Sequence, residues 1–141
     1  MPVHTLAVQK TFPVSMTVAD GTGIEKGTLL LASDPNTAAA STGANDQLAG
    51  ILYTEKIASD GNTRAAVLKG PGDILRATAS GSIGMNDALV SSATGASFVA
   101  SGQGQTVTQL SGSRILGRSL ETVTDGQTFL YELNISSLPR V

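Results

Sequence analysis

Apolar and polar residues alternate in two segments of this chain, one near each end. From residue 12 to 18 and from residue 129 to 135, every second side chain is apolar. Those side chains are Phe12, Val14, Met16 and Val18, and then Phe129, Tyr131, Leu133 and Ile135. Because successive side chains of a strand point to opposite faces, this pattern predicts two half-buried β-strands.

Short apolar runs, separated by Gly, Asp, Asn and Ser, fill the chain between these segments. They are Thr28–Leu31, Gly50–Tyr53, Ala65–Lys69, Ile74–Ala77, Ala88–Val90 and Arg114–Leu116. Many short strands at this spacing are typical of an all-β barrel or sandwich. Apolar residues rarely recur at helical spacing, although a short helix near Asp46–Ile57 stays open because that segment contains several good helix formers.

Three parts of the sequence recur loosely and in the same order. Ile24–Leu30 is similar to Ile83–Val90, Leu48–Leu52 to Ile115–Ser119, and Ser59–Thr63 to Thr124–Thr128. Self-similarity of this kind indicates a duplicated structural unit. We therefore predict two pseudo-repeats, at about residues 20–79 and 80–138, within a single β domain of residues 19–141. Residues 1–18 would form an N-terminal arm and the first strand.

Each pseudo-repeat contains an Asp-Gly pair and a glycine inside a strand pattern. The pairs are Asp60-Gly61 and Asp125-Gly126, and the strand glycines are Gly50 and Gly117. Asp-Gly is a strong hairpin signal, since both central residues of a type I′ turn need a positive φ angle. A glycine within a strand indicates a bulge or the close approach of another backbone. We interpret these residues as structural.

Two long stretches between predicted strands are rich in Ala, Ser, Thr, Gly and Asn. They are Ala32–Asn45 and Ser91–Gln105. Both exceed the roughly 4 to 6 residues that commonly connect elements in a compact domain. Such loops are either mobile tips or surfaces that become ordered against a partner, and the sequence leaves both roles open.

The composition excludes several classes of function. Ala, Gly, Ser and Thr account for 64 of the 141 positions, whereas charged residues make up 14%. Without cysteine and with one histidine, the chain can form no disulfide, no thiolate-bound zinc site and no thiol nucleophile. A net charge of −2 lacks the positive footprint of a nucleic-acid-binding protein. We also expect no membrane span and no classical export signal, because neither pattern is found.

The sequence contains no recognisable catalytic motif. It has neither a G-x-S-x-G elbow nor a G-x-x-x-x-G-K loop. His4 lies close to the start of the chain, where we expect a solvated side chain. Asp60, Asp73, Asp87 and Asp125 all fall in turn contexts, where solvent accounts for a carboxylate without any site. We therefore predict a protein that is not an enzyme and has no catalytic residue, bound metal or cofactor.

The order of these segments resembles that of a known family. An I-x-x-G-T-x-L strand beginning at Ile24 is followed by Leu48–Leu52, a polar hairpin, Lys69-Gly70 and Ile74-Leu75. The block at Ile83–Val90 is similar to a repeat in the same group. Over roughly residues 20–135, the chain resembles the capsid decoration proteins of tailed bacteriophages. These are also called head-stabilising or cement proteins, and the lambda head protein is the familiar example.

The resemblance implies a β-tulip domain that assembles as a homotrimer on the outer capsid surface of the virion, after synthesis in the host cytoplasm. It implies that the chain binds the major capsid protein and stabilises its lattice, with no nucleic-acid or membrane partner. The N-terminal arm would add a strand to a sheet edge of the coat protein. Its candidate contact residues are Pro2, Val3, His4, Leu6, Val8, Phe12 and Val14. We expect removal of residues 2–10 to leave a folded protein, and an ordinary first strand is the other interpretation of this arm.

A carbohydrate- or cell-surface-binding β module of a virion fibre or adhesin is the alternative function. Such a module needs a shallow cluster of exposed aromatic side chains that stack on sugars. The aromatic residues of the chain are Phe12, Tyr53, Phe98, Phe129 and Tyr131. Four of the five fall in strand patterns, so the exposure of these side chains separates the two hypotheses.

Overall fold

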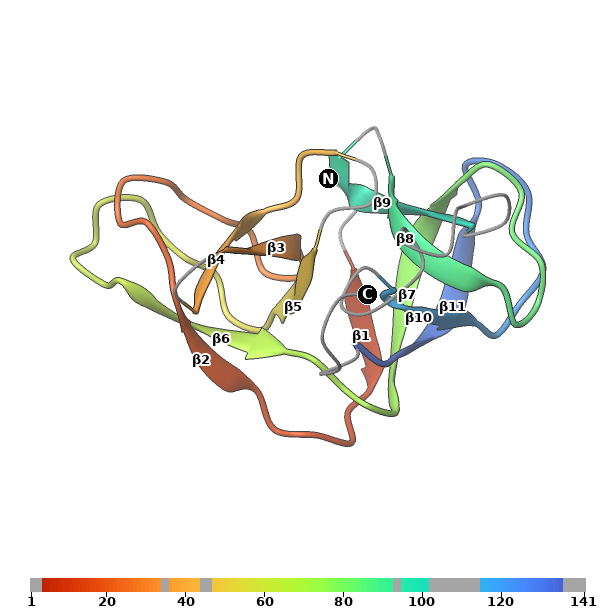
Figure 1. Ribbon diagram of the computed structural model, residues 1–141, viewed down its shortest axis with the longest axis horizontal. Helices are drawn as coiled ribbons and strands as arrows, with labels where there is room; N and C mark the ends of the chain where they lie inside the picture. Colours follow the sequence, from red (N-terminus) through yellow and green to blue (C-terminus); the bar gives the residue numbers. More distant parts are fainter. Residues whose placement is uncertain (1–3, 34–35, 44–46, 93–94, 102–114, 136–141) are drawn as a thin grey trace.

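The computed structural model describes residues 4–33, 36–43, 47–92, 95–101 and 115–135 (Figure 1). Within them the chain forms eleven strands and no helix, which confirms the predicted all-β fold. The strands are β1 (Thr5–Val8), β2 (Val14–Thr17), β3 (Leu29–Ser33), β4 (Thr37–Ala40), β5 (Leu48–Leu52), β6 (Arg64–Leu68), β7 (Asp73–Ser80), β8 (Ala88–Ser92), β9 (Gly95–Ser101), β10 (Gly117–Ser119) and β11 (Thr128–Leu133). In this part of the chain, no helix has the length and apolar character needed to cross a lipid bilayer.

Two closed barrels lie side by side in the molecule (Figure 1). The first has the strand order β2-β4-β3-β5-β6, and the second closes β7-β11-β10-β8-β9 through a parallel pairing of β9 with β7. The barrels run from Val14 to Leu68 and from Asp73 to Leu133. Each therefore begins one strand earlier than the repeats predicted at residues 20–79 and 80–138. Strand β1 pairs with β7 and lies between the barrels (Figure 1).

Every strand pairing of the first barrel has a counterpart in the second. Strands β2 to β6 correspond in order to β7, β8, β9, β10 and β11. In each barrel, the first strand pairs in parallel with the third, and all other pairs are antiparallel. The isolated bridge between Ile24 and Lys56 also corresponds to the one between Ile83 and Val123. The similar sequence segments thus occupy matching places in two copies of one arrangement.

A shared hydrophobic core joins the two barrels. The interior of the first barrel is lean, because three of its buried residues are alanines; its members are Met16, Val18, Ile24, Leu30, Ala38, Ala49, Leu52, Ala65 and Val67. The interior of the second barrel belongs to a larger cluster that also includes Leu29, Leu48, Ile51 and Leu68 of the first. Strand β5 is consequently buried on both faces, which explains its continuous apolar sequence.

Gly50 and Gly117 permit close contacts between neighbouring strands. A Cβ atom at Gly50 would lie 2.4 Å from the carbonyl oxygen of Leu68, and one at Gly117 would lie 1.9 Å from that of Glu132. The register between β3 and β5 also shifts beside Gly50, which leaves Ala49 as the extra residue of a bulge. Both glycines therefore lie where another backbone approaches, as their positions within strand patterns predicted.

Strands β4 and β9 lie in the two stretches that the sequence predicted as loops. Their sequences are Thr-Ala-Ala-Ala and Gly-Ala-Ser-Phe-Val-Ala-Ser, in which apolar and polar residues do not alternate strictly. They form because closing a barrel pairs each of them along both edges. Asp46–Ile57, for which a short helix was an open alternative, contains strand β5. The strand expected at Arg114–Leu116 begins at Gly117.

The Asp-Gly pairs lie in longer loops than the predicted two-residue turns. Gly61 and Gly126 each have a φ angle of +82°, but Asp60 and Asp125 do not have positive φ angles. The type I′ prediction is therefore wrong. The aspartates act through their side chains, since Oδ1 of Asp125 accepts a hydrogen bond from the Gly81 N–H at 2.8 Å.

Candidate interaction surfaces

The beginning of the N-terminal segment is packed between the barrels. Pro2 and Val3 lie outside the described residues, whereas His4 is only 2% exposed. The His4 N–H donates a 2.8 Å hydrogen bond to the Gly27 carbonyl, and its Nδ1 lies 2.6 Å from the Tyr131 hydroxyl. The prediction of a solvated His4 is wrong, because its ring packs edge-on against Tyr131. Burial raises the pKa of Tyr131 well above 10.0, so this hydroxyl stays protonated.

Strand β1 continues this segment as part of the folded chain. It pairs antiparallel with β7, and Leu6 packs against the shared core. The segment expected to add a strand to a coat protein therefore already uses one of its edges within its own chain. This corrects the picture of a free extended arm, because His4 is buried, Leu6 packs against the shared core and the backbone of residues 5–8 pairs with β7.

A buried carboxylate holds the connection between β1 and β2. Asp73, the first residue of β7, is fully buried. It accepts hydrogen bonds from the N–H groups of Lys10 and Thr11 and from the Thr11 hydroxyl. The Tyr53 hydroxyl also donates to Oε1 of Gln9 at 3.1 Å. The prediction of a solvated Asp73 is therefore wrong, since three donors satisfy its carboxylate inside the protein.

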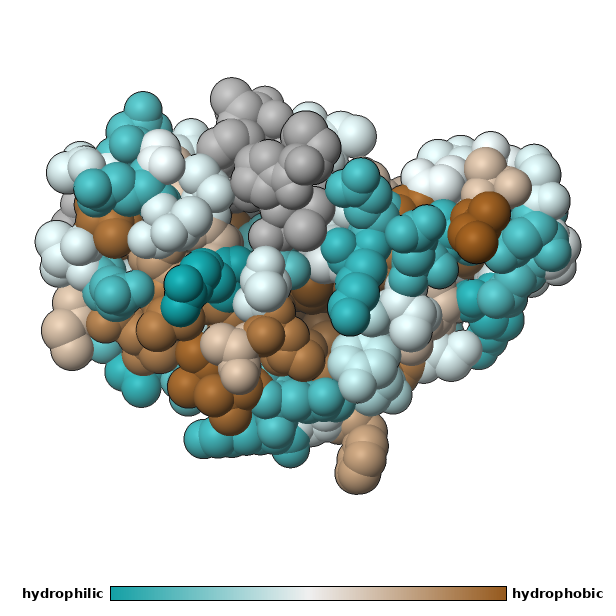
Figure 2. Space-filling model, turned by 180° about the vertical axis from the view of Figure 1, so that it is seen from behind, coloured by the Kyte–Doolittle hydropathy of each residue, from teal (hydrophilic) through white to brown (hydrophobic). Residues whose placement is uncertain are grey.

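Three apolar side chains remain exposed around this connection. Val8 and Val14 are each 44% exposed and Phe12 is 91% exposed. We call residues 8–14 the clamped loop. Alternation placed Phe12 and Val14 on one buried face with Met16 and Val18, but only Met16 and Val18 are buried. Phe12 precedes β2, and Val14 lies at the exposed start of that strand. On the opposite side of the molecule from the view of Figure 1, apolar side chains gather over the half that contains the second barrel (Figure 2).

A buried ammonium group lies at the loop end of the first barrel. The Lys56 side chain is 1% exposed, and its Nζ lies 3.0 Å from Oδ1 of Asp20 and 2.7 Å from Oδ1 of Asp60. It also donates to the carbonyl oxygens of Asp20 and Ile57. The second barrel has Val123 at the corresponding position. The ion pairs are therefore a feature of the first barrel that the shared arrangement of strands does not require.

These ion pairs predict an acid-sensitive contact. Burial lowers the pKa of Lys56, but hydrogen bonds with Asp60 and Asp20 outweigh burial and raise it above 10.5. The hydrogen bond from Lys56, followed by that from the Asn62 N–H, lowers the pKa of Asp60 below 3.8. Because the folded pKa of Asp60 lies below its unfolded value, the contact stabilises the fold above pH 3.8. That stabilisation is lost as the pH falls through the lowered pKa.

We expect an NMR titration of the Asp60 carboxyl carbon to have a midpoint below 3.8. In a Lys56→Met variant the midpoint should rise, because the main donor to the carboxylate is gone. A Lys26→Met variant is the matched control and should leave the midpoint of Asp60 unchanged. If the midpoint of Asp60 stayed the same in the Lys56→Met variant, the contact between Lys56 and Asp60 would be contradicted.

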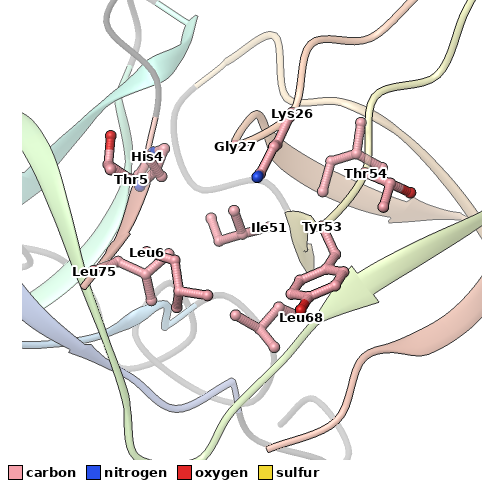
Figure 3. A pocket seen from close by; sticks show the side chains of 11 residues that line it. His4, Thr5, Leu6, Lys26, Gly27, Ile51, Tyr53, Thr54, Leu68 and Leu75 are labelled. Carbon is pink, nitrogen blue, oxygen red and sulfur yellow. The ribbon is translucent and has the colours of Figure 1, made fainter. Parts of the chain in front are cut away.

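A groove of about 380 Å³ lies between β1 and the first barrel (Figure 3). Ile51, Leu68 and Leu75 form its apolar floor, and Lys26 and Tyr53 stand at its rim. The Lys26 ammonium points into the groove (Figure 3). The sequence patterns did not reveal this groove because its walls come from strands of both barrels and from the N-terminal segment.

The four aspartates that the sequence places in turns do not come together in one site. Asp60 lies in the first barrel, whereas Asp87 and Asp125 lie in loops of the second. Asp87 accepts a 2.8 Å hydrogen bond from the Gly84 N–H. Within the described ranges, no three histidine, aspartate or glutamate side chains come together in a group that could hold a metal ion.

The arrangement of the two barrels is similar to that of a solved phage protein. The crystal structure of the N base of head fibre gp8.5 in bacteriophage phi29 matches with a TM-score of 0.53 at 16% sequence identity. The match covers 89% of this chain and 98% of that chain. The two chains share a fold. No family model and no curated protein matches the sequence. At this identity the similarity establishes the fold, and function has to be argued from the surfaces.

Proposed function

We propose that this chain is a non-enzymatic structural protein of a bacteriophage virion that attaches to the outer surface of the head. The observation that carries the proposal is the fold shared with the phi29 head fibre base over 98% of that base. The motifs that resemble decoration proteins support the same location, with the major capsid protein as partner. Stabilisation of the capsid lattice and assembly as a homotrimer belong to this proposal. A trimer would let weak single contacts combine into stable attachment.

The clamped loop is the surface best suited to this attachment. Phe12 projects into solvent while the backbone beside it is held by Asp73. Interface energy is concentrated in a few residues, among which large aromatic anchors are enriched. A surface that is ordered before binding also loses less conformational entropy on association. The loop would therefore bind as a preformed surface, without the disorder-to-order transition of a free arm.

We expect Phe12→Ser to weaken binding to heads by about 30-fold or more, since truncation of an anchor costs roughly 2 kcal/mol or more. The measurement is co-sedimentation of the purified chain with heads of the parent phage that lack it. Ile57→Ser and Met85→Ser are matched controls, because these side chains are 60% and 64% exposed in loops away from the clamped loop. Thermal melting would check that all three variants fold.

The possible results distinguish a wrong attachment surface from a wrong function. If the unmodified chain sediments with heads and Phe12→Ser does so equally well, the clamped loop is not the attachment surface. If the unmodified chain does not bind heads at all, the proposed function is wrong. If binding to heads depends on Ile57 or Met85, the attachment surface lies in the barrel loops that contain these residues.

The described surface gives less support to carbohydrate binding. Phe129 and Tyr131 are buried, Tyr53 is partly buried, and Phe12 is exposed. The side chain of Phe98 is not among those that the structure describes. Among the aromatic side chains that can be placed, exposure is thus concentrated at Phe12, and they form no exposed cluster of the kind that stacks on sugar rings.

A further inference from the structure

The groove between β1 and the first barrel has an apolar floor that can hold a hydrocarbon chain. Ile51 and Leu68 of the first barrel and Leu75 of the second form this floor and belong to the shared core. Leu6 and Tyr53 also pack against that core, but both are only partly buried and present apolar surface along the groove (Figure 3). An aliphatic chain lying here would contact side chains that are already held in place, so neither barrel would have to rearrange.

The repeated arrangement of strands does not by itself produce an apolar floor. At the equivalent place, the second barrel has a hollow of about 300 Å³ in which Arg118 and Glu132 replace Ile51 and Leu68. Nε of Arg118 lies 2.9 Å from Oε1 of Glu132, so this second hollow is lined by an ion pair. The apolar floor therefore comes from the contact between the barrels, and the second hollow serves as an internal comparison for it.

Lys26 adds a charge that its turn does not need. The equivalent turn of the second barrel has Met85 at this position and keeps a positive φ angle at the next residue, 69° at Asn86 and 86° at Gly27. The Lys26 ammonium points into the groove (Figure 3), and in the described part of the chain no ion pair involves it. No aspartate or glutamate is among the described residues that line the groove. A cation beside an apolar floor is complementary to a ligand with an anionic end and an apolar body.

The size and the polar groups of the groove favour a small monocarboxylate. Its volume of about 380 Å³ lies near the lower end of the roughly 300 to 1,000 Å³ that is typical of small-molecule sites. One ammonium group can balance one carboxylate, whereas phosphate sites use several donors, such as the fork of an arginine or a row of backbone N–H groups. The floor is made of leucine and isoleucine side chains, which suits an aliphatic chain.

We propose that this groove binds a small aliphatic monocarboxylate. The hydrocarbon chain lies over the floor between Leu6 and Tyr53, and the carboxylate pairs with Lys26 at the rim. The chain supplies most of the affinity, because a partly exposed ion pair is weak. The ion pair selects an acid of this length. Such a site goes beyond the attachment of the protein to heads.

The test is an NMR titration of the full chain, labelled at amide and methyl groups, with three probes. Octanoate has the proposed chain and charge, octan-1-ol has the same chain without the charge, and butanoate has the charge on a shorter chain. We expect saturable binding of octanoate, with shifts at Ile51 and Leu68 and none at Arg118. Butanoate should bind at least tenfold more weakly, because each buried methylene raises affinity roughly fourfold.

Lys26→Met tests the ion pair. Methionine is the residue that the second barrel has at this place, so the variant should fold. We expect its affinity for octanoate to be about fivefold lower and its affinity for octan-1-ol to be unchanged. Lys10→Met is the matched control, since it removes a lysine that does not line the groove, and it should bind both probes as the parent chain does.

Four results would overturn the proposal. They are the absence of saturable octanoate binding, an octanoate affinity that is the same in Lys26→Met, butanoate binding as strong as that of octanoate, and shifts centred on Arg118. The third would show that the apolar floor is not used, and the last would place the site in the second barrel. Heads are not involved in any of these measurements, so the result is independent of the proposed function.

Discussion

Replacing Gly117 with alanine is expected to destabilise the folded chain by about 3 kcal/mol, at the upper end of the cost of overpacking. The new Cβ atom would lie 1.9 Å from the carbonyl oxygen of Glu132. That oxygen belongs to β11, which is paired with β10 at Gly117 and with β7 on its other edge. Because the obstacle is backbone inside a closed barrel, it cannot rotate away as a side chain would.

Gly126→Ala is the matched control for this substitution. Gly126 has a φ angle of +82°, and a Cβ atom there would meet nothing within 4 Å. Alanine at that position should cost only the roughly 1 to 2 kcal/mol of a left-handed conformation. Urea denaturation of the two variants measures the difference. Equal losses would contradict the close approach of β10 and β11.

Removal of residues 2–10 is expected to destabilise the chain by about 3 to 5 kcal/mol or to prevent folding. This reverses the expectation from the sequence, which treated the segment as separable. The truncation leaves the Tyr131 hydroxyl buried without His4 and removes one donor to the carboxylate of Asp73, and each such loss costs about 1 to 3 kcal/mol. It also removes Leu6 from the shared core.

Chemical denaturation of the truncated chain checks this prediction. Gln9→Ala is the control within the same segment, because it removes two exposed hydrogen bonds, one from the Tyr53 hydroxyl and one to the Thr11 carbonyl, and should change stability little. A truncated chain as stable as the parent would show that residues 2–10 are not part of the fold. Any loss of head binding by the truncated chain has to be interpreted together with its stability, whereas Phe12→Ser tests the surface alone.

The patterns along the chain predicted those features that depend on neighbouring residues. Alternation located β11, and the apolar runs located β3, β5, β6, β7 and β8. The loosely repeated segments anticipated two copies of one unit, and Gly50 anticipated a bulge. The sequence patterns missed strands β4 and β9 because small residues give little indication of whether a segment is buried. Their positions follow from pairing partners that are distant in the sequence.

The buried polar residues were predicted least well. His4 and Asp73 were expected in solvent because their neighbours are typical of a chain end and a turn. In the fold, Asp73 meets donors that lie 62 and 63 residues away, and His4 meets Tyr131, 127 residues away. A polar side chain can be buried when such partners form hydrogen bonds with it. The local sequence does not indicate where those partners lie in the fold.

The sequence by itself determined that this is an all-β chain, lean in bulky and charged residues and built from two similar units. Strand periodicity and turn residues are local properties, so they can be read before the chain folds. Only the tertiary structure decided that the N-terminal segment is packed between the barrels and that Phe12 is exposed on a clamped loop. It also decided that Lys26 faces an apolar groove. These outcomes depend on contacts between residues far apart in the sequence, and such contacts exist only once both barrels have closed.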